Sequence, residues 1–238
     1  MKTAAAQFTP VPGDIETNVR FMCGLIRAAA GRGARLVVFP ELALTGYEPG
    51  LIRKDPGLWP AEDDERLEPV REACRAGSAA AVVGGPVRTE SGKPGITSLV
   101  IGPCGELLTR YDKLHLHGAE NDIFEAGTED GRFTLDGVRF ALATCYDNRF
   151  PDIAERAEAD GCRAYLASSV LDTENDSFDK VYPVRARENG LYVVLANVLG
   201  HNEAGECRGG SAVWGPDGRR IADAGTEDPG LALADLPL

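Results

Sequence analysis

The stretch "SLVIGPCGELL" at residues 98–108 has an echo in "SAVWGPDGRRI" at residues 211–221. Both follow the pattern S-x-V-x-G-P-x-G, in which two strand-like runs flank a tight turn. Proline fixes the φ angle of such a turn, and glycine relieves the crowding at its corner. Two such hairpins in corresponding halves predict two β-sheets related by approximate symmetry, although G-P-x-G turns are also common on their own.

Strand and helix patterns alternate around these hairpins. An apolar series at helical spacing follows Asp14, a residue type that often caps helices, and ends near Gly31. The alternation predicts an α/β domain in which hairpins add antiparallel strands, and no low-complexity linker divides residues 1–238 into two domains. The strands are expected at 2–8, 35–41, 79–85, 97–113 (a hairpin), 138–145, 163–170, 191–198 and 210–214, and further helices at 62–76, 152–160 and 176–189.

Length and composition narrow the class of protein. With 238 residues, 43% of them hydrophobic, the chain is long enough for one large domain, and such a domain buries roughly 70–75% of its unfolded surface. No apolar run approaches the ~18 residues of a membrane span. The start, "MKTAAAQFTP", is typical of a first strand rather than of a signal peptide. We therefore expect a cytoplasmic protein.

Charge and cysteine content exclude several kinds of partner. The formal net charge of -12 disfavours nucleic acids and anionic membranes, because both need a basic surface. The six cysteines form no C-x-x-C pair, and the three histidines lie apart from them. We therefore expect free thiols, no metal and no cofactor.

Three predicted strands end in groups with complementary chemistry. Glu41 follows "VVFP", Lys113 lies in "TRYDKLHL", and Cys145 ends "FALATC". A thiol has a pKa near 8.5, so a nucleophilic cysteine needs a base or a nearby positive charge. Glu41 can take the thiol proton, and Lys113 can stabilise negative charge on an intermediate. Taken singly, each of these residues is more often structural or solvated.

The segments around these residues resemble a known family. "FPELALTGY" (39–47), "YDKLHL" (111–116) and "CYDNRFP" (145–151) are similar, in order and spacing, to the three signature segments of the nitrilase superfamily of carbon–nitrogen hydrolases. The likeness covers nearly the whole chain, since it extends to "AAAQFTPVPGDIETNV" (4–19), "VRARENGLYVVLANVLG" (184–200) and "GGSAVWGPDG" (209–218).

The resemblance implies a fold and a catalytic set. The fold is a four-layer α-β-β-α sandwich, which agrees with the paired hairpins. The catalytic Glu-Lys-Cys set corresponds to Glu41, Lys113 and Cys145. A further family glutamate, in an E-x-x-x-F-x-x-G context, corresponds to Glu120, whereas the competing Glu125 falls after the phenylalanine.

A mechanism follows from this set as a hypothesis. Glu41 removes the proton of Cys145, and the thiolate attacks an amide carbonyl. Lys113 and the backbone N–H of Tyr146 hold the oxyanion. Glu41 protonates the departing amine, and water activated by Glu41 then hydrolyses the thioester. Glu120 would orient Lys113 and keep its ammonium charged.

The substrate class is narrowed by the residues after the cysteine. Family members act on nitriles, aliphatic amides and N-carbamyl amines. The "CYDNRFP" form, with Tyr-Asp after the cysteine, is closer to the amidase and carbamoylase branches than to true nitrilases. We therefore expect an aliphatic amidase that converts a small carboxamide to a carboxylate and ammonia. An N-carbamyl amine amidohydrolase or a nitrilase on the same fold is the alternative.

An acidic segment bears on the far end of the substrate. "LDTENDSFDK" (171–180) follows a predicted strand, and Asp172 and Glu174 there could bind an ammonium or guanidinium group. This suggests an ω-amino or guanidino alkanamide. The alternative is a solvated helix start, because acidic residues favour the first turn of a helix. Tyr47 and Tyr146 are expected to form walls of the pocket.

Two other functions are compatible with parts of the sequence. A Cys–His hydrolase would use His115, His117 or His201 as its base. A non-catalytic small-molecule binding protein on the same fold would have no need for all four matched residues together. The resemblance implies a homodimer or a larger homo-oligomer.

Overall fold

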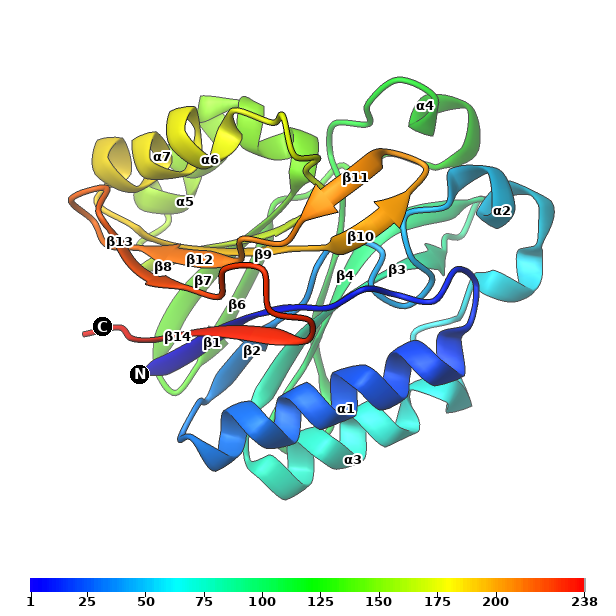
Figure 1. The fold of residues 1–238 in the computed structure, drawn as a ribbon, viewed down its shortest axis with the longest axis horizontal. Helices are drawn as coiled ribbons and strands as arrows, with labels where there is room; N and C mark the ends of the chain where they lie inside the picture. Colours follow the sequence, from blue (N-terminus) through cyan, green and yellow to red (C-terminus); the bar gives the residue numbers. More distant parts are fainter. Residues whose placement is uncertain (238) are drawn as a thin grey trace.

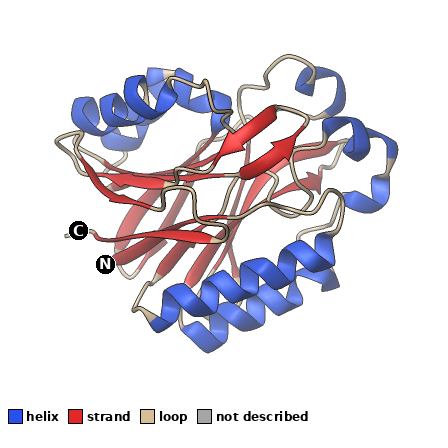
Figure 2. Cartoon of the chain, in the orientation of Figure 1, coloured by secondary structure: helices blue, strands red, loops and turns tan. Residues whose placement is uncertain are grey.

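Two six-stranded sheets pack face to face between layers of helices in the computed structural model, which describes residues 1–237 (Figures 1 and 2). The first sheet has the order β14 (Gly230–Asp235), β1 (Lys2–Gln7), β2 (Leu36–Val38), β3 (Ala80–Arg88), β4 (Pro94–Ile101) and β5 (Leu107–Asp112). The second has the order β13 (Arg220–Asp223), β12 (Ala212–Trp214), β9 (Tyr192–Asn197), β8 (Ala164–Ser169), β7 (Val138–Thr144) and β6 (Gly131–Leu135).

The helices form the two outer layers. The first sheet is covered by α1 (Ile15–Gly31) and α3 (Glu68–Gly77), and the second by α5 (Pro151–Ala159), α6 (Ser177–Lys180) and α7 (Tyr182–Asn189). The short helices α2 (Pro49–Lys54) and α4 (Glu120–Ile123) lie beyond one end of the sheets (Figure 1). The predicted four-layer α-β-β-α sandwich is therefore confirmed.

The two sheets repeat one topology, which confirms the symmetry predicted from the hairpins. In the first, the parallel strands β1, β2 and β3 continue into the antiparallel β4 and β5, and β14 flanks β1. In the second, β7, β8 and β9 are parallel, β12 and β13 follow, and β6 flanks β7. The turns also match: Gly102 N donates to Glu106 O at 2.8 Å, and Gly215 N donates to Arg219 O at 2.9 Å.

The core between the sheets belongs to both halves of the chain. Val38 and Val82 of the first sheet are in one buried apolar cluster with Leu142, Leu166 and Val194 of the second. Burying one such side chain stabilises a fold by about 1.5–3 kcal/mol. Each half therefore depends on the other to remove its inner face from water.

Helix α1 illustrates how the local sequence determines an element. The Asp14 carboxylate accepts a hydrogen bond from Thr17 N at 3.0 Å, which satisfies one free N–H group of the first turn. The apolar positions Ile15, Met22 and Ile26 recur on one face of the helix and are buried. The helix predicted after Asp14 is confirmed.

Two other predicted helices differ because of proline. The helix expected over 62–76 begins only at Glu68, since Pro69 has no N–H group and belongs in a first turn; a 3-10 segment, Glu65–Leu67, precedes it. The helix expected over 176–189 is divided at Val181, because Pro183 cannot donate to the carbonyl four residues earlier.

Several short strands were absent from the sequence prediction. They are β6, β14 and a separate two-stranded sheet of β10 (Leu199–Asn202) and β11 (Gly205–Arg208). The β10–β11 hairpin contains glycine and charged residues and lacks a clear alternation of apolar and polar positions. Along residues 1–237, no helix has both the length and the apolar character needed to cross a membrane.

Candidate active site

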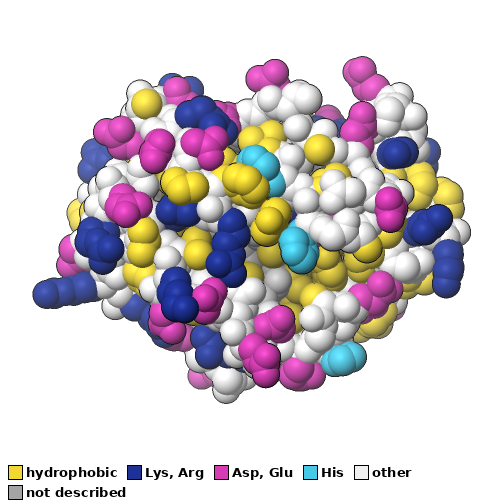
Figure 3. Space-filling model, turned by 90° about the horizontal axis from the view of Figure 1, so that it is seen from above, with side chains coloured by type: hydrophobic (Ala, Val, Ile, Leu, Met, Phe, Trp, Pro, Cys, Tyr) yellow, Lys and Arg dark blue, Asp and Glu magenta, His cyan; other side chains and the backbone are white. Residues whose placement is uncertain are grey.

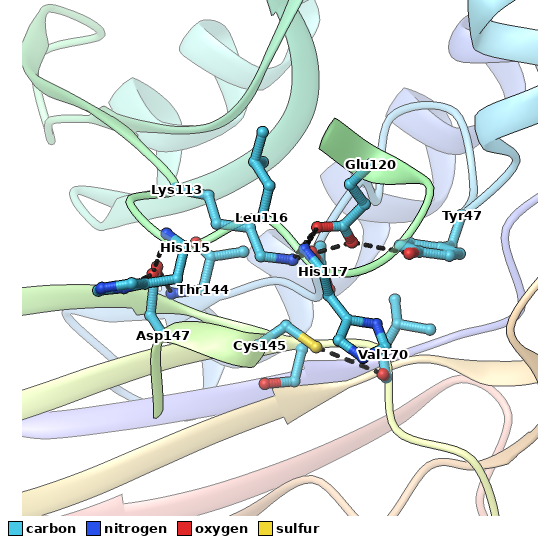
Figure 4. A network of polar contacts seen from close by, with 12 residues as sticks. Tyr47, Lys113, His115, Leu116, His117, Glu120, Thr144, Cys145, Asp147 and Val170 are labelled. Atoms are coloured by element: carbon cyan, nitrogen blue, oxygen red, sulfur yellow. Dashed lines mark hydrogen bonds and ion pairs between the residues drawn. The ribbon is translucent and has the colours of Figure 1, made fainter. Parts of the chain in front are cut away.

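The strands that carry the predicted catalytic residues end at the same edge of the sandwich. Glu41 lies shortly after β2, Lys113 directly after β5 and Cys145 directly after β7. The two sheets touch here, because Ser168 Oγ at the end of β8 donates to Phe39 O at 2.7 Å. The fold thereby brings together residues that are far apart in the chain (Figure 4).

Lys113 is the centre of the cluster. Its Nζ is fully buried and donates to Glu41 Oε1 at 2.8 Å and to Glu120 Oε1 and Oε2 at 3.0 and 2.8 Å. Burial alone would lower the pKa of Lys113, but the charges of Glu41, Cys145 and Glu120 raise it above its ordinary value. The ammonium group therefore stays charged at neutral pH.

The Glu41 carboxyl is placed to move protons. It is buried; Oε1 accepts from Lys113, while Oε2 has no hydrogen-bond partner among the described residues. Burial raises the pKa of Glu41 to about 7, the Glu120 charge adds to this effect, and Lys113 and the Cys145 thiol oppose it. A carboxyl that titrates near neutral pH can both accept and return a proton.

Cys145 has a left-handed backbone, with φ at +47°. A residue with a side chain adopts this conformation at a cost of about 1–2 kcal/mol, so the surrounding contacts must hold it. The half-buried Sγ lies 3.5 Å from Val170 O, to which it donates. Burial and the Glu41 charge raise the pKa of the thiol well above its ordinary value, against the effect of Lys113. The resting cysteine is therefore a protonated thiol that needs a base.

Asp147 holds the turn that presents Cys145. Its fully buried carboxylate accepts from Thr144 N at 3.0 Å, from Tyr111 OH at 2.6 Å, and from His115 N and Nδ1 at 2.9 and 3.0 Å. These bonds join β7, β5 and the segment after Lys113, so Asp147 braces the turn that presents Cys145.

Glu120 begins α4 and receives further donors besides the ammonium described above. Tyr47 OH donates to Oε1 at 2.7 Å and His117 N donates to Oε2 at 2.8 Å (Figure 4). The competing Glu125 lies away from this cluster and accepts instead from Ser91 Oγ at 2.5 Å. The geometry thus joins Glu120, rather than Glu125, to the predicted catalytic set.

A cavity of about 680 Å³ opens over Cys145. Three of the predicted substrate-binding residues, Tyr47, Tyr146 and Asp172, line it. Glu174 does not: it is exposed, and its backbone N–H donates to Asp172 Oδ1 at 3.0 Å. The structure therefore brings Asp172 to the site and places Glu174 outside it.

The mouth of the cavity carries charges of both signs. Arg149 lines it and forms an ion pair with Asp176 at 3.1 Å. His117 and Glu203 also line the cavity. On the face of the molecule seen from above Figure 1, hydrophobic, acidic, basic and histidine side chains are interspersed (Figure 3).

The three histidines give little support to a Cys–His enzyme. His115 bonds Asp147 and stacks on Phe150, with ring centroids 3.6 Å apart. His201 pairs with Glu206 at 3.6 Å, and His117 lines the cavity. Within residues 1–237, no histidine forms a hydrogen bond with the thiol of Cys145.

In the part of the chain that the structure describes, no three His, Cys, Asp or Glu side chains lie close enough together to hold a metal ion. All six cysteines are free thiols, as expected. The positive charge in the buried cluster comes from Lys113, which pairs with both Glu41 and Glu120.

Two features of the site could not be read from the sequence. Tyr47 is expected only as a pocket wall, yet its hydroxyl group bonds Glu120; Val170 O, the thiol's acceptor, has no side-chain signature at all. The only hint for Tyr47 is that it closes the same segment, "FPELALTGY", that carries Glu41.

A thiol beside a buried carboxylate and an ammonium, at the shared edge of two sheets in an α-β-β-α sandwich, defines a hydrolase with an active-site cysteine. The chain belongs to the carbon–nitrogen hydrolase family, whose model matches residues 2–238. This is the nitrilase superfamily that the signature segments indicate.

Relatives of known name agree with this membership. The chain is 32% identical over 231 residues to a Pseudomonas protegens protein named "Hydrolase in pqqF 5'region", with 96% of this chain and 80% of that protein covered. It is 30% identical over 234 residues to omega-amidase NIT2 from Homo sapiens, with 93% and 83% covered.

Solved structures of an amidase share the fold. The NitN amidase from Nesterenkonia sp. AN1 is similar with a TM-score of 0.90 at 30% identity, covering 100% of this chain and 93% of that one. One structure of that amidase shows Michael addition of acrylamide at the active site cysteine, and another holds butyramide.

Proposed function

We propose that this protein is an amidase that hydrolyses small aliphatic carboxamides to carboxylates and ammonia through a thioester on Cys145. The observation that carries the proposal is the free, buried Oε2 atom of Glu41, on a carboxyl with a pKa of about 7, in the same cluster as a protonated thiol. The base, the nucleophile and a charged ammonium are then all supplied by the chain itself.

Acylation begins with the thiol proton. Glu41 Oε2 accepts it as the Cys145 sulfur forms a bond to the amide carbonyl carbon. The raised pKa of the thiol means that the proton leaves only as this bond forms. Glu41 then gives the proton to the amide nitrogen, the C–N bond breaks, and ammonia departs to leave the thioester.

The oxyanion needs donors in the same place. Lys113 Nζ and the backbone N–H of Tyr146 are the two that the site offers, and one such donor is typically worth about 10²–10³ in rate. All three N–H bonds of Lys113 are already used in the resting site. One bond to Glu120 can pass to the oxyanion, because Tyr47 OH and His117 N continue to satisfy that carboxylate.

Deacylation uses the same base in reverse. Glu41, deprotonated again once ammonia has left, accepts a proton from water as the water oxygen attacks the thioester carbon. The tetrahedral intermediate collapses to the carboxylic acid, the C–S bond breaks, and the sulfur regains its proton. Glu120 acts throughout as the partner that holds Lys113.

The substrate class is supported by the cavity and by the relatives. A cavity of about 680 Å³ has room for a short acyl chain above Cys145. Similar proteins are named omega-amidases, and the similar Nesterenkonia amidase holds acrylamide or butyramide. A small primary carboxamide is therefore the first substrate, ahead of N-carbamyl amines and nitriles.

An ω-amino or guanidino alkanamide is the second candidate, favoured by Asp172. Its carboxylate lines the cavity, and among residues 1–237 only Oδ1 has a hydrogen-bond partner. Arg149 at the same mouth would repel a cation unless Asp176 keeps it paired. Comparing kcat/KM for 4-aminobutanamide and pentanamide in the wild type and in Asp172→Asn tests this candidate. If Asp172→Asn lowers kcat/KM for 4-aminobutanamide but not for pentanamide, the candidate is supported. If the substitution changes kcat/KM equally for both amides, the candidate is excluded.

A substrate panel tests the main proposal. Butanamide, N-carbamyl-β-alanine and butanenitrile are incubated with the wild type and with Cys145→Ala, and ammonia release and intact mass are measured. We expect ammonia from the amide, a transient mass increase on the wild type that corresponds to an acyl group, and neither for Cys145→Ala. Full turnover by Cys145→Ala would overturn the proposal.

Three further expectations stay predictions. They are assembly as a homodimer or larger homo-oligomer, a cytoplasmic location, and independence from metals and cofactors. Light scattering on the purified protein measures the first, and activity after treatment with a chelator measures the last.

A further inference from the structure

The β10–β11 hairpin (residues 199–208) reaches across the end of the sandwich toward α2 (Figure 1). Its turn places Glu203 and Ala204 in the lining of the active-site cavity. At its base, Leu199 N donates to Phe8 O at 3.1 Å. Gly200 has φ at +81°, and a Cβ there would lie 2.7 Å from Thr9 Cγ2, so glycine is needed for the hairpin to leave the sheet at this point.

Glu203 at the tip holds the segment that follows the Glu41 loop. Both of its carboxylate oxygens accept from Gly50 N, at 3.0 Å each, and its own backbone N–H donates to Tyr47 O at 3.2 Å. The residues from Tyr47 to Gly50 are thus fixed at both ends by a single residue of the hairpin.

We propose that Glu203 is a positioning residue for this active site: by holding the Tyr47–Gly50 segment it keeps Tyr47 OH on Glu120, and through Glu120 it keeps Lys113 in place. The proposal rests on the proposed function, because its kinetic effect is on amide hydrolysis. Glu203 touches none of the reacting atoms itself.

Tyr47 is the link that carries this effect. Its hydroxyl group donates to Glu120 Oε1 at 2.7 Å, and Glu120 in turn accepts from Lys113. Tyr47 also packs against a buried apolar cluster of Val170, Val198 and Cys207, to which the hairpin contributes Cys207. A shift of the Tyr47 backbone would lengthen the hydrogen bond from Tyr47 OH to Glu120. Lys113 and the His117 backbone N–H would then be the remaining donors to that carboxylate.

The hairpin also touches the opposite wall of the cavity. Thr173 N donates to Glu206 O at 2.9 Å, and Asp172 forms an antiparallel bridge with Cys207. One side of the hairpin therefore holds Tyr47 and the other holds Asp172. The distance between these two walls is set by an element that supplies no reacting group.

The rival role for Glu203 is electrostatic, as an acid at the cavity mouth that attracts a cationic substrate. The two roles make different predictions for Glu203→Gln with a cationic amide. The amide oxygen of glutamine can still accept from Gly50 N, so a positioning role predicts activity within about twofold of the wild type. An electrostatic role predicts a rise in KM for a cationic amide and no change for a neutral one.

A double-mutant cycle with butanamide tests the positioning role. The variants are Glu203→Ala, Tyr47→Phe and the double variant. Glu206→Gln is the matched control, because Glu206 is an exposed acid on the same hairpin whose side chain pairs with His201. We expect each single variant to lower kcat about five- to tenfold. The double variant should be no slower than Tyr47→Phe, because both changes act by removing the same hydrogen bond, from Tyr47 OH to Glu120. The control should have the kcat of the wild type.

Amide hydrogen exchange gives a readout that needs no turnover. In Glu203→Ala, the amide of Gly50 should exchange at least about tenfold faster than in the wild type and in Glu206→Gln, because its acceptor is lost. If the wild type released ammonia from no amide, the proposed function would be wrong. The exchange measurement would still test whether Glu203 holds Gly50. Unchanged exchange, or additive losses of kcat in the double variant, would overturn the role of Glu203.

Discussion

At the scale of single residues, the proposed mechanism assigns the acid–base chemistry to Glu41 and Cys145, two groups whose pKa values burial raises. The pKa values of Glu41 and of Cys145 are both raised, so at neutral pH the proton remains on sulfur and Glu41 is shared between its two forms. The site therefore does not store a thiolate. In the proposed mechanism, Glu41 is the base, and the thiolate forms only when a carbonyl carbon is there to receive it.

The pH dependence of the rate follows from Glu41. Its carboxyl must be deprotonated to accept the thiol proton, so kcat/KM for a neutral amide should rise as the pH is raised through about 7. The raised pKa means that activity is lost below this value, because the proton then occupies the base. Initial rates with butanamide between pH 5 and 9 measure it. A midpoint near 4.5, the ordinary value for glutamate, would contradict the effect of burial.

Asp147 offers a test of how the nucleophile is held. In Asp147→Asn the side chain keeps the same shape but loses one acceptor oxygen, so buried donors such as Thr144 N or Tyr111 OH face an amide N–H₂ group. We expect the free energy of unfolding to fall by about 1–3 kcal/mol, with loss of activity. Urea unfolding measures it. Asp217→Asn, at an exposed turn with one bond to Arg219 N, should change stability by no more than about 0.5 kcal/mol.

At the scale of elements, the position of Glu41 depends on how closely β3 approaches the loop after β2. A Cβ on Gly84 would lie 2.5 Å from Pro40 O and 2.9 Å from Leu42 N, the two neighbours of Glu41. No side chain fits there unless the loop moves. The backbone of one strand is thus the surface against which the base is set.

Gly84→Ala should therefore damage catalysis through the backbone alone. A displacement of about 1 Å in a catalytic group can cost roughly 10²-fold in rate, and overpacking of this kind costs about 1–3 kcal/mol of stability. We expect kcat/KM for butanamide to fall by about that factor while the circular dichroism spectrum is retained. An unchanged rate would mean that the Glu41 loop tolerates the added methyl group.

Gly24→Ala is the matched control for this substitution. Gly24 lies in the interior of α1, is exposed, and has nothing within 4 Å of an added Cβ. Alanine is the better helix former, so this variant should gain about 0.5–1 kcal/mol in the free energy of unfolding and keep full activity. Thermal and urea unfolding of the two variants side by side separate the effect of space from that of the glycine itself.

The elements that sequence reasoning predicts well are those with a local cause. The cap at Asp14, the G-P-x-G turns and the strands that end just before Lys113 and Cys145 all follow from patterns within a few residues. Contacts between distant segments leave no such pattern. Tyr47 and Glu120 are 73 positions apart, and Gly50 and Glu203 are 153 apart, so their bonds exist only once both sheets and the hairpin are in place.

At the scale of the whole molecule, the site is divided between the two halves of the chain. Glu41, Lys113 and Glu120 follow strands of the first sheet, and Cys145 directly follows a strand of the second. The last strand, β14, returns to pair with β1 in the first sheet, with Lys2 opposite Asp235 and Gln7 opposite Gly230. The halves are therefore joined by the site, by the core between the sheets and by β14, which comes from the end of the chain and pairs with β1.

We predict that the two halves unfold together. The two tryptophans report on them separately, since Trp59 lies in the first half and Trp214 in β12 of the second. In Trp59→Phe and in Trp214→Phe, the urea midpoint from the remaining tryptophan's fluorescence should coincide with the midpoint from circular dichroism. Separate midpoints for the two halves would contradict a single cooperative unit and the one-domain expectation for residues 1–238.

The division of the site between the halves has a practical consequence. Thr128 and Glu129 are exposed between α4 and β6, so the chain can be opened there into two fragments. One fragment carries the base and the ammonium, and the other carries the thiol together with the strand that completes its partner's sheet. Neither should release ammonia alone. If the fragments are fused to two proteins that bind each other, association of those proteins should reassemble the site and restore ammonia release. The pair of fragments would then serve as a split-enzyme reporter of that association.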